Sequence, residues 1–179
     1  MINLLKNRRS IRKFTDEAVS KEDLQKILKA GLLSPSSMGK NPVEFIVIQD
    51  KEIIAKLEEC KKFGTVPLKT APLVICILAD SELSDVWVED ASIVSILMQL
   101  EVEKLGLGST WIQIRNRECS EGDSQEAVRK VLSIPKKYGV LSLIAIGHKN
   151  EEKKPYTDED LNFEKVHYEN FNDKNNWLC

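Results

Sequence analysis

An uninterrupted apolar run near the middle of the chain limits the possible folds more than any other feature. Residues 72–79 read Pro-Leu-Val-Ile-Cys-Ile-Leu-Ala, without the polar alternation of a strand that faces water on one side. A strand of this kind must be covered on both faces. Residues 140–147 form a second apolar run, which predicts the last core strand. The chain is therefore expected to build a layered sheet with helices packed over it.

The rest of the chain reads as helices and strands in alternation. Apolar spacing predicts helices over 2–9, 21–33, 51–63, 85–105 and 125–134, with Ser20 and Ser124 as N-caps, and strands over 44–49, 72–79, 109–114 and 140–147. The helix over 85–105 is apolar around most of its circumference, so we expect it to be central and mostly buried. It has more apolar surface than one sheet face needs, so part of it is expected to meet a symmetry mate.

Residues 150–179 are expected to form an arm rather than part of the core. The segment is charged, and its largest apolar residues are spaced aromatics: Tyr156, Phe163, Tyr168, Phe171 and Trp177. It is too apolar in places to be plain disorder. Such an arm can lie across its own subunit or across a partner, and the whole chain of 179 residues fits a single domain.

Composition narrows the functional classes. The formal net charge is −2, so the general electrostatic footprint of a nucleic-acid-binding protein is absent. No apolar stretch approaches about 18 residues, and no long apolar leader follows Met1, so we expect neither a membrane span nor a secretory signal. The widely spaced cysteines, without CxxC, favour free thiols in a reduced cytoplasmic protein; they are Cys60, Cys76, Cys119 and Cys179.

One short stretch is strongly basic. Residues 8–14 read Arg-Arg-Ser-Ile-Arg-Lys-Phe. If this stretch is extended, one face carries Arg8, Ser10, Arg12 and Phe14. Two guanidinium groups and a hydroxyl on one face suit a phosphate and a polar ring edge. Taken alone, however, such a stretch is more often a solvated basic turn.

Other catalytic patterns are missing from the sequence. There is no GxSxG, no GxxxxGK[ST] loop and no His, Cys and carboxylate cluster at metal-ligand spacing. The histidines, His148 and His167, both follow the last predicted core strand, and by position they read as ordinary surface or interface residues. The remaining possibility is a binding site for a ligand that carries both an anionic group and a ring.

Four segments, in order, resemble the nitroreductase family of FMN-dependent NAD(P)H oxidoreductases. They are 8–14, 34–45 (Ser-Pro-Ser-Ser-Met-Gly-Lys-Asn-Pro-Val-Glu-Phe), 105–114 (Leu-Gly-Leu-Gly-Ser-Thr-Trp-Ile-Gln-Ile), and 134–138 (Ile-Pro-Lys-Lys-Tyr) leading to 144–148 (Ile-Ala-Ile-Gly-His). The resemblance runs from about residue 2 to about residue 171. It implies an α+β fold with a central mixed or antiparallel sheet covered by helices. It also implies a homodimer with FMN at the interface and an exchanged C-terminal arm.

The resemblance assigns roles to individual positions. Arg8 and Ser10 are expected near the phosphate and ribityl chain, and Arg12 near the N1–O2 edge of the ring, where a fixed cation stabilises the charge of the reduced flavin. Residues 35–37 are expected to reach the FMN held mainly by the other subunit, and the backbone of 112–114 to approach the flavin N5. The cofactor-binding positions implied are Arg8, Arg9, Ser10, Arg12, Pro35, Ser36, Ser37, Asn41, Ile112, Gln113, Ile114, Gly147 and His148. No catalytic side chain and no metal ligand is expected.

The chain departs from the family pattern in three places. Val43 stands where many members carry an aromatic residue, and Asn41 stands where glutamine is usual. Many members place a Lys-x-Arg phosphate clamp after the last strand, whereas this chain offers Lys149, Lys153 and Lys154 without an arginine.

The expected activity is hydride transfer from NADH or NADPH to the flavin and onward to a small oxidised acceptor, such as a nitroaromatic or a quinone, in a ping-pong mechanism. A flavin-binding carrier or sensor without turnover is the alternative. A small nucleic-acid-binding module that uses residues 8–14 is disfavoured by the acidic balance and the missing aromatic platform. The sequence names neither the acceptor nor the preferred nicotinamide.

Overall fold

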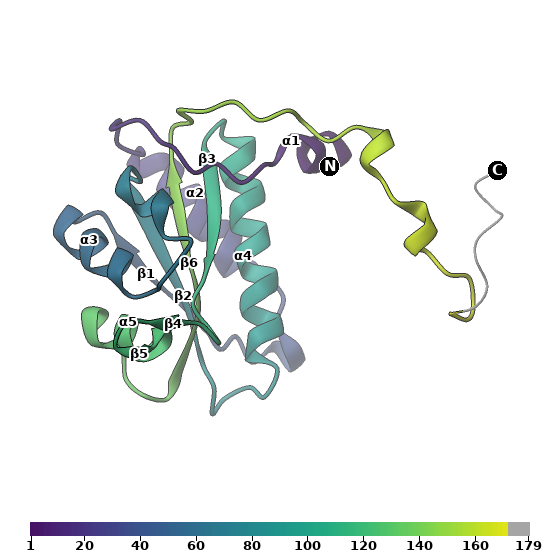
Figure 1. The fold of residues 1–179 in the computed structure, drawn as a ribbon. Coiled ribbons are helices and arrows are strands. Elements are labelled where there is room, and N and C mark those ends of the chain that lie inside the picture. The colour runs from purple at the N-terminus through teal and green to yellow at the C-terminus, as the bar shows by residue number, and fades with distance from the viewer. Residues whose placement is uncertain (172–179) are drawn as a thin grey trace.

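The computed structural model describes residues 1–171, and the order of its elements follows the sequence expectation (Figure 1). Trp177 and Cys179, counted above among the aromatics and the thiols, lie outside the described residues. The α-helices are α1 (Ile2–Asn7), α2 (Lys21–Leu32), α3 (Lys51–Glu59), α4 (Trp87–Lys104) and α5 (Ser124–Leu132). The strands are β1 (Val43–Ile48), β2 (Leu73–Asp80), β3 (Gly108–Gln113), β4 (Glu118–Cys119), β5 (Gly122–Asp123) and β6 (Tyr138–Gly147). Four short 3-10 turns are η1 (Ser37–Gly39), η2 (Val66–Lys69), η3 (Asp158–Asp160) and η4 (Phe163–Lys165).

The core is a four-stranded sheet in the order β1-β2-β6-β3, and each neighbouring pair is antiparallel. Of the two sheet types expected, the antiparallel one is therefore present. The central strand β2 is buried from Leu73 to Ala79, as its continuous apolar run predicted. β3 lies at one edge, paired with β6 along one side. A separate two-stranded hairpin of β4 and β5, which was not expected, follows β3.

Helices cover both faces of the sheet (Figure 1). On one face, α2 and α4 pack through a cluster that includes Ile27, Met98 and Ile144. On the other face, α3 and α5 pack through a cluster that includes Leu57 and Val128. The result is the α+β, helix-covered sheet that the sequence predicted.

Local hydrogen bonds decide where the helices begin and end. Ser20 Oγ accepts the Asp23 N–H at 3.0 Å and caps α2, as predicted. The expected cap at Ser124 is wrong: Asp123 caps α5, and Ser124 is the first helical residue, fully buried. Asp123 takes this place because its carboxylate accepts two backbone N–H groups, those of the second and third helical residues. α3 ends at Glu59 rather than at residue 63.

α4 is the central helix that was expected, but it is buried on one side only. Ala91, Val94 and Met98 are at most 3% exposed against the sheet and α2. Ile93 and Ile96, on the opposite side, are 40% and 38% exposed. Within residues 1–171, no helix is long and apolar enough to cross a membrane.

The chain after β6 leaves the body as an extended arm (Figure 1). Its first part is tied to α1, because the Tyr156 N–H donates to the Lys6 carbonyl at 2.9 Å and Lys6 Nζ pairs with Asp158 at 2.7 Å. Arg9 donates to the Lys154 carbonyl, and its guanidinium lies 4.3 Å from the centre of the Tyr156 ring. These contacts fix the direction in which the arm leaves the body.

Candidate functional site

The basic stretch crosses one end of the sheet in an extended conformation. Ser10 forms a bridge with Ser109 at the start of β3, and the Ile11 N–H donates to the Ser109 carbonyl at 2.9 Å. Further along, the Thr15 N–H donates to the His148 carbonyl at 3.0 Å, just beyond β6. The stretch therefore joins two of the three other regions in which the sequence placed site residues, β3 and the end of β6.

The side chains of this stretch do not follow the expected alternation. Ile11 and Phe14 are each 2% exposed and both enter the core, although they are three residues apart. The expectation that Phe14 shares a face with Arg8, Ser10 and Arg12 is therefore wrong. The physical reason is that the stretch changes partner, from β3 at Ser10 to the segment after β6, and a strand that changes partner does not keep a single face.

The three arginines have different surroundings. The side chain of Arg9 holds the arm, so Arg9 would contact a cofactor through its backbone. Arg12 is exposed, and its Nη1 lies 3.4 Å from the Ser10 carbonyl. Its backbone N–H donates to the Glu151 carboxylate, which lowers the pKa of Glu151. Arg8 has no side-chain partner within the described residues, so Arg8 and Arg12 are the arginines whose side chains remain for an anion.

The outer edge of β3 presents backbone groups beside this stretch. Because the Ser109 carbonyl accepts from Ile11, the backbone of Ser109 faces away from β6. Alternation along an antiparallel strand then turns the N–H groups of Trp111 and Gln113 to the same outer edge. No strand covers this edge in the part of the chain that the structure describes.

The backbone of residues 112–114 was expected to approach the flavin N5. Of these three residues, Gln113 is the one whose N–H faces the outer edge of β3. Ile114 turns its N–H the other way, to the Leu141 carbonyl at 3.0 Å, and Ile112 has the same orientation by alternation. The side chains of Ile112 and Ile114 are at most 1% exposed in the core. The Gln113 side chain is held by the Trp111 Nε1–H, which donates to its Oε1 at 2.9 Å.

A buried carboxylate anchors the loop that carries Pro35, Ser36 and Ser37. Asp90, 3% exposed in the first turn of α4, accepts the Ser37 N–H on Oδ1 at 2.9 Å. Its Oδ2 accepts the Ser84 hydroxyl at 3.3 Å. The sequence reasoning missed Asp90, although an acidic residue at the start of an otherwise apolar helix was a usable signal.

The rest of this loop is held by its own side chains. Ser36 Oγ accepts the Asn41 N–H at 2.8 Å and donates to Asn41 Oδ1 at 3.0 Å. Asn41 Nδ2 donates to the Gly39 carbonyl at 3.1 Å, and Asn41 has a left-handed φ of 48°. Asn41 therefore shapes the loop internally, and Pro35 is exposed at its start.

The loop at 35–37 and the basic stretch lie near different parts of α4. The loop at 35–37 meets the helix at Asp90, whereas Gln99 Nε2 donates to Ser109 Oγ at 3.2 Å, beside the basic stretch. Nine residues of helix separate these contacts, or about 14 Å along the axis.

The last two expected positions lie behind the basic stretch. Gly147 is buried, and a Cβ on it would lie 2.7 Å from Pro72 Cδ and 3.0 Å from Phe14 Cβ. His148 Nε2 lies 3.5 Å from a Glu17 carboxylate oxygen. Within the described residues, Gly147 therefore serves close packing, and the His148 side chain lies beside Glu17.

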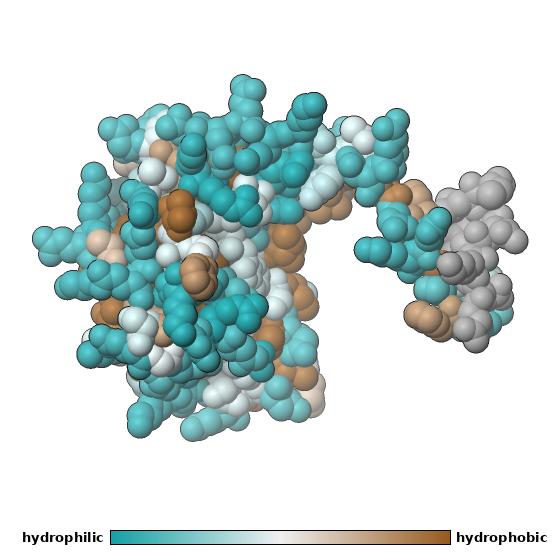
Figure 2. Space-filling view, viewed as in Figure 1, coloured by the Kyte–Doolittle hydropathy of each residue, from teal (hydrophilic) through white to brown (hydrophobic). Residues whose placement is uncertain are grey.

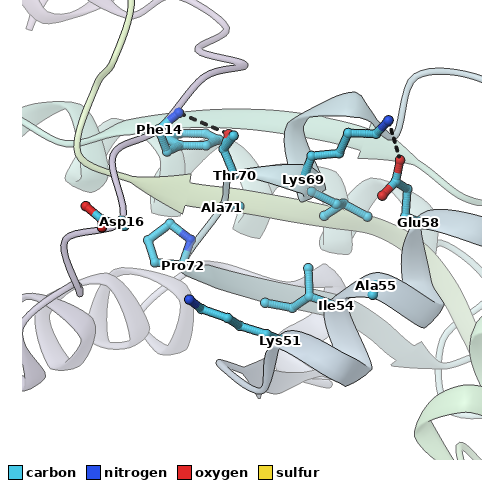
Figure 3. Close-up of a pocket in the computed structure, with 11 residues that line it drawn as sticks. Phe14, Asp16, Lys51, Ile54, Ala55, Glu58, Lys69, Thr70, Ala71 and Pro72 are labelled. Carbon is cyan, nitrogen blue, oxygen red and sulfur yellow. Dashed lines mark hydrogen bonds and ion pairs between the residues drawn. The ribbon is translucent and has the colours of Figure 1, made fainter.

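Two hollows flank the basic stretch. One, of about 660 Å³, lies between α1 and residues 149–153 and is lined partly by Arg9 and Lys149. The other, of about 450 Å³, has Phe14 and Pro72 on one side and Ile54 on α3 opposite (Figure 3). At the rim of the second hollow, Lys69 pairs with Glu58 at 3.4 Å. Of the residues expected to hold a cofactor, Arg9 alone lines either of these two hollows.

The donor set fits a flavin mononucleotide. An N–H on an open strand edge can face a ring nitrogen, and the neighbouring Arg8 and Arg12 can meet a phosphate and a ring carbonyl. Among the described residues, no group of three or more His, Cys, Asp or Glu side chains could hold a metal ion.

Comparison with known proteins finds related sequences and structures over nearly the whole chain. The model of the nitroreductase family matches residues 5–65 and 59–148. A protein of Archaeoglobus fulgidus, provisionally named NADH dehydrogenase/NAD(P)H nitroreductase, is 36% identical over 174 residues, which cover 94% of this chain and 97% of the relative. An FMN reductase [NAD(P)H] of Bacillus subtilis is 30% identical over 87% of this chain and 69% of its own length. The solved structure of an FMN-dependent nitroreductase from Clostridium difficile R20291 superposes with a TM-score of 0.94, at 52% identity, and covers 96% of this chain and 100% of that one.

Proposed function

Because the chain belongs to the nitroreductase family, we propose that it is an FMN-dependent oxidoreductase that uses NADH or NADPH to reduce a small oxidised acceptor. Bound FMN would supply the redox chemistry, accepting a hydride at N5 and passing electrons to a nitroaromatic, a quinone or a similar compound in a ping-pong cycle. The observation that carries the proposal is the open edge of β3, where the outward N–H of Gln113 lies on the strand that the basic stretch crosses.

The residues of the chain bind and orient. The Gln113 N–H is fixed by the sheet, so it can hold a ring nitrogen in place without reorganisation. Arg12 is proposed to supply a cation for the ring edge on which negative charge accumulates when the flavin is reduced. Arg8 and Ser10 are proposed to bind the phosphate and the ribityl hydroxyls.

Each site is proposed to need two subunits. The loop at 35–37 meets α4 about 14 Å along the helix axis from the contact beside Ser10, so one subunit does not gather both groups around one small ring. A second copy related by a two-fold axis would bring its loop to the first copy's basic stretch.

The surface of the chain supports a homodimer. Figure 2 shows apolar side chains along the flank of α4, on the side from which the arm leaves, and more on the arm itself. The exposed apolar residues of these two regions are Ile93, Ile96, Tyr156, Leu161, Phe163, Val166, Tyr168 and Phe171. An arm with this many uncovered side chains is proposed to embrace the second subunit, since apolar surface of this extent marks an interaction site. A cytoplasmic location suits Cys60, Cys76 and Cys119, which are free thiols.

The proposal is tested with purified protein reconstituted with FMN. In buffer freed of O₂, we expect yellow, dimeric protein that oxidises NADH or NADPH only when a nitroaromatic or quinone acceptor is supplied, with parallel lines in double-reciprocal plots. Protein that holds FMN but gives no NAD(P)H oxidation would be a carrier or sensor. Protein that retains no FMN, or only FAD, would contradict the cofactor assignment.

A further inference from the structure

A basic pocket opens at the end of the β3 edge. It measures about 520 Å³ and lies between residues 61–64, after α3, and residues 116–118, after β3. The two segments are tied together twice: the Lys62 N–H donates to the Glu118 carbonyl at 3.0 Å, and Lys62 Nζ pairs with the Glu118 carboxylate at 3.0 Å. The pocket walls are therefore held in place independently of any ligand.

The pocket holds two cations that lack an acidic partner. Lys62 is neutralised by Glu118, but neither Lys61 nor Arg117 has a carboxylate within 4.0 Å among the described residues. Arg117 Nη1 donates to the carbonyl of its neighbour Asn116 at 2.9 Å. Burial, and then the charge of Arg117, lowers the pKa of Lys61. Two cations that line one pocket without a carboxylate partner form a site whose energy falls when an anion enters.

An exposed aromatic ring stands beside these cations. Phe63 is 82% exposed, which is unusual for a phenylalanine in a structured loop. Gly64 follows it with φ of 85°, and Lys61 Nζ packs 3.4 Å from the position that a Cβ on Gly64 would take. The short loop thus brings an exposed aromatic ring and an ammonium group to the lining of the same pocket. A planar base that carries a phosphate matches this pair of features.

The pocket lies just beyond β3, the strand whose outer edge is proposed to hold the flavin ring. The Arg117 N–H donates to the Ile114 carbonyl at 3.1 Å, and this turn keeps Arg117 close to the end of β3. Gln113, whose N–H marks the ring edge, precedes Ile114 by one residue. A nicotinamide donor placed over the ring can therefore extend its other half toward Lys61 and Arg117.

We propose that Lys61 and Arg117 bind the 2′-phosphate of NADPH while Phe63 stacks on its adenine, so that the enzyme prefers NADPH to NADH. This inference rests on the proposed function. It deepens that function by naming the donor that the sequence left open.

Steady-state kinetics with both donors test the inference. In Lys61→Gln and in Arg117→Gln, the ratio of kcat/KM for NADPH to that for NADH should fall about tenfold, through KM, since each change removes one charge-assisted hydrogen bond. Lys21→Gln, at the start of α2 on the opposite face of the sheet, removes the same charge elsewhere and should leave the ratio unchanged. A wild-type ratio near one, or a Lys61/Arg117 double variant with the wild-type ratio, would overturn the inference.

A binding measurement separates this inference from the proposed function. Calorimetry of FMN-loaded protein should show binding of 2′,5′-ADP that Arg117→Gln weakens about tenfold, with 5′-AMP and inorganic phosphate binding more weakly. If the wild type binds 2′,5′-ADP in this way but oxidises neither donor, the proposed activity fails and the pocket stands. If it oxidises NADPH but 2′,5′-ADP binds no better than 5′-AMP, the pocket assignment fails and the activity stands.

Discussion

The Asp90 carboxylate accepts the backbone N–H of Ser37 at 2.9 Å, and this contact joins α4 to the loop that is proposed to reach the partner's flavin. Asp90 Oδ2 also takes the Ser84 hydroxyl, so both carboxylate oxygens are engaged in a site that is 3% exposed. A buried acceptor with two donors holds a loop more firmly than a surface contact does. The loop is therefore prearranged for binding before a cofactor arrives.

Replacing Asp90 should loosen that loop. Asp90→Ala leaves the Ser37 N–H and the Ser84 hydroxyl without an acceptor, and we expect the free energy of unfolding to fall by about 1–3 kcal/mol. The dissociation constant of FMN should rise by a factor of about five or more. Flavin fluorescence titration measures this constant. Asp90→Asn keeps an oxygen that can accept the Ser37 N–H, so its FMN affinity should lie between those of wild type and Asp90→Ala; equal losses in both variants would show that the hydrogen bond is not what matters.

Arg9 should control the root of the arm. Arg9→Ala removes the hydrogen bond to the Lys154 carbonyl and the contact with the Tyr156 ring. We expect proteolytic cleavage within residues 151–171 to become about tenfold faster, because the arm detaches more often. Lys6→Ala removes one exposed ion pair with Asp158 and should have a much smaller effect. Mass spectrometry can follow the cleavage with time. A cleavage rate in Arg9→Ala equal to that of the wild type would contradict this role.

Arg12 should act on the rate of flavin reduction more than on folding. Its guanidinium is exposed, with one long contact of 3.4 Å to the Ser10 carbonyl, so little stability depends on it. Arg12→Ala should slow reduction by NAD(P)H about 10- to 100-fold in stopped-flow traces of fully loaded protein. Lys13→Ala, an exposed neighbour of the same charge, is the control and should reduce at the wild-type rate. A fully loaded Arg12→Ala enzyme that is reduced as fast as wild type would remove the role.

Gly147 should prove structural. A Cβ there would lie 2.7 Å from Pro72 Cδ and 3.0 Å from Phe14 Cβ, so Gly147→Ala must displace Pro72 and crowd Phe14 of the basic stretch. We expect a loss of about 1–3 kcal/mol in the free energy of unfolding, measured by urea titration. Adding Pro72→Ala removes the nearest clashing ring and should restore part of this loss. If the double variant is no more stable than Gly147→Ala, the strain does not come from the contact with Pro72.

The buried thiols should be inert in the folded protein. Burial raises the pKa of Cys60 to about 11 and that of Cys76 to about 12. A thiol reacts as the thiolate, so at pH 8 only roughly one Cys60 in a thousand is reactive, and reactivity rises with pH toward the raised pKa. Peptide mapping after iodoacetamide treatment at pH 8 should find both residues unmodified until guanidinium unfolds the chain. Fast labelling of native Cys76 would be inconsistent with its burial.

Much of the fold could be predicted because it depends on local patterns. The apolar run at 72–79 determined a strand covered on both faces, and the apolar helix at 85–105 determined a central element with a second face to cover. The four ordered motifs also indicated the nitroreductase family. These features survive in a linear sequence because periodicity and composition are properties of neighbouring residues.

The arrangement of the site was decided by tertiary structure. Phe14 turned into the core because residues 8–14 change their pairing partner from β3 to the segment after β6, and no local pattern encodes that change. Gln113, rather than Ile112 or Ile114, faces the open edge because the register with β6 sets which N–H groups remain outside. Asp90 accepts a hydrogen bond from Ser37, and Lys61 lines one pocket with Arg117. The two residues of each pair are about 50 positions apart in the chain. Such contacts arise only when the folded chain brings distant segments together, which is why the sequence determined the elements and the tertiary structure determined the chemistry between them.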